Sequence, residues 1–95
     1  MRQDYAGVVL SCANPIYWVQ ETDHVLVVDE THQKTYILSG VEGALWNWLV
    51  LAYPYNKVVD LLATLLGLSI PTAEVHMHTI LRKWLDAGLL WSETY

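Results

Sequence analysis

The sequence predicts an α+β fold in which a three-stranded antiparallel sheet precedes three helices. Short runs rich in β-branched and aromatic residues follow Pro15, separated by polar turns, as is typical of strands in hairpins. The second half of the chain carries apolar residues at helical spacing, interrupted at Pro54 and Gly67. A chain of 95 residues is near the length at which one hydrophobic core suffices, so we expect a single domain over residues 1–95.

The predicted sheet begins after an N-terminal arm, about residues 1–15, which shows no clear apolar period. Strands are expected at residues 16–21, 24–30 and 35–38. The connections between these strands are short and polar, which favours two hairpins and an antiparallel meander. With sequential connections, the third strand lies at an edge of the sheet.

Capping residues predict the bounds of the first two helices. Ser39 is expected to begin the first helix, because Ser39 and Glu42 fit a capping box in which each side chain satisfies a backbone N–H. Asn56 is expected to cap a second helix over residues 57–66. Gly67 then stands where a helix commonly ends in a left-handed conformation.

The third helix is expected to open within "SIPTAEV", residues 69–75, with Pro71 in its first turn. It runs to about Ala87 and is stopped by Gly88, after which residues 89–91 form an extended tail. Its wide apolar face contains Met77, Ile80, Leu81, Trp84 and Leu85. Three helices after a small sheet are the arrangement of a winged helix-turn-helix domain.

Composition argues against several classes of function. The net charge of −5 is unfavourable for binding nucleic acid, which requires clustered Lys and Arg. A single cysteine, Cys12, excludes an internal disulfide and is typical of a reducing compartment. No signal peptide is recognisable and no apolar run is long enough to span a membrane, so we expect a cytoplasmic protein.

No catalytic, metal-binding or cofactor-binding motif is evident. His76 and His78 are two positions apart, so on a helix their side chains point about 200° apart and cannot hold one metal together. Cys12 lies in the arm with no neighbouring charge that would activate its thiol. We therefore expect no enzyme activity, no metal and no cofactor.

An edge strand and the flank of an apolar helix together predict a groove. The strand at residues 35–38 presents unpaired N–H and C=O groups, which invite an added strand. Tyr36 and Leu38 share one face of this strand, and Thr35 and Ile37 share the other. If the third helix packs beside this edge, its flank forms the second wall. The residues of that flank are Val75, His78, Leu81, Arg82 and Leu85.

Two further functions fit the same pattern of elements. A winged-helix regulator would insert its third helix into DNA, but the polar side of residues 72–87 is close to neutral. A structural subunit of a larger enzyme would use the open edge to complete the sheet of its partner.

Three segments, "VLVVDETHQKTYILSGVEGALWNWL", "VVDLLATLLGL" and "ILRKWLDAGLL", resemble the PqqD-like proteins. These are the peptide-recognition elements of pathways that modify ribosomally made peptides, including the stand-alone leader-binding proteins of lasso-peptide biosynthesis. The likeness covers roughly residues 16–90. Its marks are a short strand ending in Leu38, a small polar residue at Ser39, a tryptophan in the first helix and the closing "WLDAGLL".

The resemblance implies a non-catalytic protein that binds the leader segment of a precursor peptide by strand addition to the third strand, beside the third helix. It implies that the backbone of Thr35, Tyr36, Ile37 and Leu38 pairs with the leader. Tyr36 and Leu38 would form the floor of the groove, Val75, His78, Leu81, Arg82 and Leu85 would form its wall, and Arg82 would meet an acidic leader residue.

The expected partners are the precursor leader peptide and a separate modifying enzyme or leader peptidase, with neither nucleic acid nor membrane. The protein itself would be a monomer or a strand-exchanged dimer. Three tryptophans, Trp46, Trp48 and Trp84, are assigned to the core. Trp18 and Trp91 are assigned to a surface that docks the enzyme.

Overall fold

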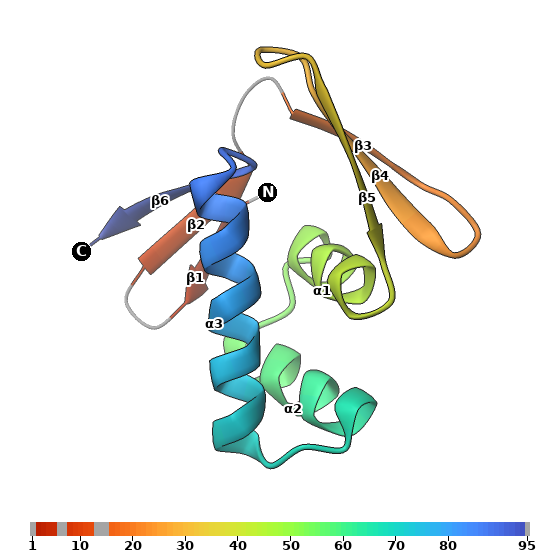
Figure 1. Ribbon diagram of the computed structural model, residues 1–95. Coiled ribbons are helices and arrows are strands. Elements are labelled where there is room, and N and C mark those ends of the chain that lie inside the picture. Colours follow the sequence, from red (N-terminus) through yellow and green to blue (C-terminus); the bar gives the residue numbers. More distant parts are fainter. Residues whose placement is uncertain (1, 6–7, 13–15, 95) are drawn as a thin grey trace.

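The computed structural model describes the backbone of residues 2–5, 8–12 and 16–94 and the side chains of residues 16–90 (Figure 1). An antiparallel sheet contains β3 (Ile16–Gln20), β4 (His24–Asp29) and β5 (Lys34–Ser39), in that order. Three helices follow: α1 (Val41–Val50), α2 (Tyr55–Leu66) and α3 (Ile70–Asp86). The predicted α+β fold, with a three-stranded antiparallel sheet followed by three helices, is confirmed.

The two ends of the chain form a second sheet that the sequence analysis missed. The expected arm contains β1 (Arg2–Tyr5) and β2 (Val8–Cys12), and the expected tail is β6 (Leu90–Thr94). These strands pair antiparallel in the order β1-β2-β6 (Figure 1). Because β2 and β6 come from opposite ends of the chain, no local pattern of residues indicates their pairing.

Two glycines form the tight connection between β5 and α1, which the sequence analysis misread as a capping box. Ser39 ends β5, and Gly40 takes the N-cap position with a φ of 59° and no side-chain cap. A residue with a Cβ adopts this φ only with strain. Glu42 contacts Lys83 of α3 instead of the start of its own helix. A Cβ on Gly43 would lie 2.7 Å from the carbonyl oxygen of Leu38, so α1 packs directly on the backbone of β5.

The remaining helix ends agree with the sequence except at one cap. Pro54, without a side-chain cap, precedes α2, so the cap predicted at Asn56 is wrong. Gly67 ends α2 in the left-handed conformation, as predicted. The hydroxyl of Ser69 accepts a hydrogen bond from the backbone N–H of Thr72 at the start of α3, and Pro71 lies in the first turn.

Trp46 is the centre of the core. Its side chain is fully buried and contacts the ring of Trp18 on β3 edge-on, with ring centroids 5.9 Å apart. On its other side it contacts Trp84 of α3 edge-on at 5.2 Å. Edge-to-face pairs at these distances are favourable beyond the area they bury. The sheet, α1 and α3 are therefore connected through one chain of aromatic rings, which confirms the core assignment of Trp46 and Trp84.

Replacing Gly43 with Ala tests the close packing of α1 on β5. Alanine favours a helix over glycine by about 1 kcal/mol, so the variant would be more stable if its methyl group had space. Because the Cβ would press against the Leu38 carbonyl, we expect a net loss of about 1–2 kcal/mol in the free energy of unfolding. Urea unfolding followed by tryptophan fluorescence measures it.

Gly40→Ala is the comparison variant, since a Cβ at Gly40 meets no atom within 4 Å and its cost comes from the backbone conformation alone. A Gly43→Ala protein more stable than the wild type would contradict the described contact.

Candidate functional site

The free edge of β5 is the first component of the site. In the described part of the chain, β5 pairs with β4 on one side and with no strand on the other. The edge predicted from the order of elements is therefore present. Tyr36 of β5 and Leu85 of α3 line a common hollow, so this edge lies beside α3.

The hydrogen-bond pattern identifies which residues of β5 have their backbone groups free. The N–H of Glu21 donates to the carbonyl of His24 at 2.8 Å, so these two residues form a hydrogen-bonded pair that closes the β3–β4 hairpin. Such pairs alternate along an antiparallel ladder. Along β4, every second residue from His24 thus directs its backbone toward β3, and Val25 and Val27 direct theirs toward β5.

The partners of Val25 and Val27 on β5 are Leu38 and Tyr36, whose backbone groups are therefore used by β4. The intervening residues, Thr35 and Ile37, direct their N–H and C=O groups to the open side of β5. These groups are the donors and acceptors that an added strand would use.

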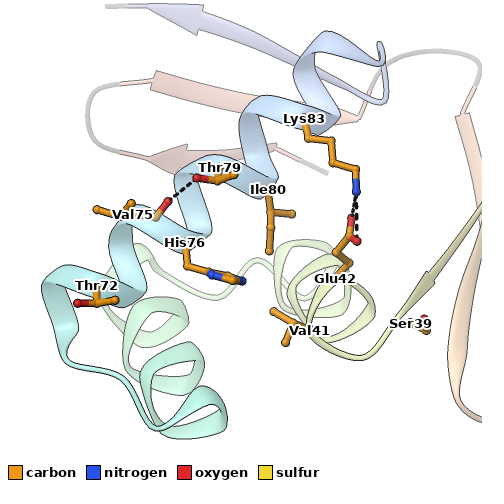
Figure 2. Close-up of a pocket in the computed structure, with 9 residues that line it drawn as sticks. All are labelled: Ser39, Val41, Glu42, Thr72, Val75, His76, Thr79, Ile80 and Lys83. Carbon is orange, nitrogen blue, oxygen red and sulfur yellow. Dashed lines mark hydrogen bonds and ion pairs between the residues drawn. The ribbon is translucent and has the colours of Figure 1, made fainter.

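Two hollows lie along α3: one between α1 and α3, which reaches β5 only at its last residue, Ser39, and one between β5 and the end of α3. The first, here the α1-side hollow, has a volume of about 470 Å³ and is shown in Figure 2. It is lined by Ser39, Val41, Glu42, Thr72, Val75, His76, Thr79, Ile80 and Lys83. The second, here the hairpin-side hollow, has a volume of about 410 Å³. It is lined by His32, Lys34, Tyr36, Leu85, Asp86, Ala87 and Gly88.

An ion pair connects α1 and α3 at the wall of the α1-side hollow. The Lys83 ammonium lies 3.1 Å and 3.3 Å from the two carboxylate oxygens of Glu42, and Figure 2 shows the lysine side chain extending from α3 toward α1. Both groups are partly exposed, so the pair contributes little to stability. Its effect on the site is to neutralise the charges at this position of the groove.

The structure brings together only part of the predicted site. Tyr36 and Leu85 both line the hairpin-side hollow, and Val75 lines the α1-side hollow. Leu38 and Leu81, predicted as floor and wall, are instead buried in the core, at 5% and 4% exposure.

His78 and Arg82 were also predicted to line the groove, and their placement needs correction. They surround a different shallow hollow, with Glu74, Val75 and Thr79. Arg82 is paired with Asp86 at 3.4 Å. The periodicity of α3 identifies its buried stripe but not which of its two flanks lines the α1-side hollow. That flank carries Thr72, His76, Thr79 and Lys83, which the sequence analysis did not select.

Polar contacts with α2 occupy the opposite flank of α3. The hydroxyl of Tyr55 donates a hydrogen bond to Glu74 and lies 3.4 Å from Nε2 of His78. Burial, together with the neighbouring Glu74 carboxylate, raises the pKa of Tyr55 to about 12, so the phenol stays protonated and remains a donor. This flank is therefore engaged in holding α2 and α3 together.

Catalytic and metal-binding arrangements were sought among the same residues. Among the residues whose side chains are described, no three His, Cys, Asp or Glu side chains are grouped so that they could hold a metal ion. No single helix within the described ranges is long and apolar enough to cross a membrane; only α2 and α3 taken as one span, bent by 102°, meet that length and composition. Cys12 and Trp91 lie outside the residues whose side chains are described.

Comparison with known proteins gives no match: no family model, no curated protein and no solved structure is similar to this chain.

A buried carboxylate fixes the hairpin from which β5 begins. Asp29 is 2% exposed, and its carboxylate accepts hydrogen bonds from Nδ1 of His32 at 2.7 Å and from the backbone N–H of His32 at 3.2 Å. The pKa of Asp29 is lowered below its ordinary value of 3.8, chiefly by the side-chain hydrogen bond from His32. Burial acts on this pKa in the opposite direction but does not outweigh the hydrogen bond. Because Asp29 pairs with Lys34, these bonds also fix the first residue of β5.

Asp29→Asn tests this arrangement through its pH dependence. A carboxyl whose pKa is lower in the folded state contributes stability above its unfolded pKa, about 4, and loses it as the pH falls through the folded value. The wild type should therefore lose unfolding free energy more steeply than Asp29→Asn as the pH falls below about 4, and should be the more stable of the two near neutral pH. Urea unfolding across this pH range measures both.

Asp60→Asn removes the same charge from an exposed position on α2 and is the matched control. Parallel pH profiles for the wild type and Asp29→Asn would contradict the assignment.

Proposed function

We propose that this protein binds the leader segment of a ribosomally made precursor peptide as an added strand on β5 and delivers it to a separate modifying enzyme or leader peptidase. The observation that carries the proposal is the free backbone of Thr35 and Ile37 beside the hairpin-side hollow, which β5 shares with α3. It is supported by the resemblance to PqqD-like proteins. The protein acts by binding and positioning, without catalysis.

Other strands also lie at sheet edges, so an open edge alone does not select β5. In the two described sheets, β1, β6 and β3 are edges as well. Strand addition is specific when alternate side chains of the guest enter pockets beside the edge. The hairpin-side hollow lies beside β5 at Lys34 and Tyr36, and the α1-side hollow begins at the last residue of the strand, Ser39. These hollows give the β5 edge the means to distinguish one peptide from another.

The lining of the hollows indicates how the guest is held. Val41, Val75 and Ile80 supply apolar surface in the α1-side hollow, and Tyr36 and Leu85 supply it in the hairpin-side hollow. Guest side chains that point toward the helices enter these hollows, while backbone bonds to Thr35 and Ile37 hold the strand. A free leader is disordered, so its ordering offsets part of the binding free energy and favours a complex that can release the peptide.

The charges on α3 favour peptide binding over DNA binding. Its two adjacent cations, Arg82 and Lys83, are each paired with a carboxylate, Asp86 and Glu42 respectively. A winged-helix regulator needs several uncompensated donors for phosphates along this helix. A structural subunit that accepts a strand from its partner would use the same β5 edge, and a genetically linked precursor peptide distinguishes the leader-binding function from it.

Ile37→Pro tests strand addition on β5. Proline removes the N–H that Ile37 directs to the open side, while the ladder with β4 uses the backbone of Tyr36 and Leu38, so the fold should survive. We expect affinity for a precursor peptide encoded beside this gene to fall at least about tenfold, from the lost hydrogen bond and the obstructing ring. Isothermal titration calorimetry measures the affinity, and circular dichroism confirms folding.

Gln20→Pro is the matched control, because Gln20 lies on β3 with its backbone N–H directed to the opposite open edge of the same sheet. This variant should bind the peptide as the wild type does. Unchanged affinity in a folded Ile37→Pro protein would contradict binding at β5.

A further inference from the structure

The face of the β3–β4–β5 sheet that is turned away from the helices is apolar. Register places Tyr17 beside Val28 and Val28 beside Thr35; in the next row, Val19 lies beside Leu26 and Leu26 beside Ile37. These six residues are here called the outer face. Tyr17, Val19 and Ile37 are 55%, 54% and 67% exposed, and Leu26 and Val28 are half-buried. No residue of the outer face is charged.

Within the outer face, Ile37 has a special position. It lies on the edge strand, so its backbone groups point to the open side of β5 while its side chain stands on the outer face. In a sheet, residues directly opposite each other on neighbouring strands place their side chains on the same face. A guest residue opposite Ile37 therefore presents its side chain next to Ile37 and away from both hollows.

We propose that Ile37 is a specificity-determining residue and that the peptide class bound on β5 is apolar on both faces of its strand. The guest's inward side chains fill the hollows, and at least one outward side chain packs against Ile37 as a fourth column of the outer face. This inference rests on the proposed strand addition and adds the composition of the ligand. An amphipathic strand, with charged residues at its outward positions, is then a poor ligand.

The energetics of cross-strand pairs support a measurable preference. An apolar pair directly opposite contributes up to about 1 kcal/mol relative to alanine, which corresponds to a preference of roughly two- to fivefold at a single guest position. In the free peptide this apolar side chain is exposed to water, and packing against Ile37 removes part of it from water. The outer face ends at the open edge of β5, so a strand added there continues the same face, and the guest strand is the occupant that it fits best.

Selection from a random twelve-residue peptide library displayed on phage tests the inference. The wild type should enrich peptides that are apolar at inward positions and also apolar at one or more outward positions. Ile37→Lys should change the outward preference to Asp or Glu while leaving the inward preference intact. A synthetic peptide selected on the wild type should bind Ile37→Lys about two- to fivefold more weakly.

Val19→Lys is the matched control. It places the same charge on the same face, in the same row, but on β3, with Leu26 between it and Ile37. Its selected peptides should have the same outward residues as those of the wild type.

The outcomes separate the two proposals. Selected peptides that bind a folded Ile37→Pro protein as tightly as the wild type would overturn strand addition on β5. The other outcome is that selected peptides lose affinity for Ile37→Pro, which supports strand addition. If those peptides show no preference at outward positions, or if Ile37→Lys selects the same outward residues as the wild type, only the role of Ile37 is overturned. If Val19→Lys changes the selected outward residues as much as Ile37→Lys does, the role of Ile37 is also overturned, because the effect would then come from charge at a distance.

Discussion

The position of Trp46 between the sheet and α3 is the constraint on which the rest of the structure depends. Its ring contacts Trp18 of β3 on one side and Trp84 of α3 on the other, so the width of this side chain separates β3 from α3. The indole N–H groups of Trp46 and Trp84 have no hydrogen-bond partner among the described residues, a cost that is offset by the burial of two large rings. Because α1 fills the space beneath the sheet, α3 does not close over the β5 edge, and hollows remain on both sides of the ion pair between α1 and α3.

The same close packing accompanies the open edge of β5. A tight connection at Gly40 turns the chain from β5 directly into α1, which packs at Gly43 on the backbone of β5, and within the described residues no strand pairs with the other side of β5. Natural proteins usually protect such edges, since they promote aggregation. Here the backbone of Thr35 and Ile37 stays open beside apolar hollows, which is the arrangement expected of a site that another chain completes. In the function proposed above, binding depends on main-chain hydrogen bonds and on a few side chains that select the guest.

Much of the fold follows from local patterns, whereas the site depends on contacts that local patterns do not specify. Runs of β-branched and aromatic residues predicted β3, β4 and β5, and helical spacing with Gly67 and Pro71 predicted the helices. The capping box failed because the Glu42 carboxylate pairs with Lys83 instead, a residue distant in sequence. The second sheet was missed because it joins the two ends of the chain. Of the predicted wall, Leu81 is buried and His78 and Arg82 line a different hollow, because a buried stripe has two flanks and only the packing of α1 against α3 decides which one lines the α1-side hollow.

Amide hydrogen exchange of β5, measured by NMR with and without a saturating precursor peptide, tests the central claim most directly. In the free protein, the amides of Tyr36 and Leu38 should be protected by β4, and those of Thr35 and Ile37 should exchange rapidly with solvent. With peptide bound, Thr35 and Ile37 should become protected as well, giving four successive protected amides. Protection of Thr35 and Ile37 in the free protein, or their continued rapid exchange in the saturated complex, would contradict the account.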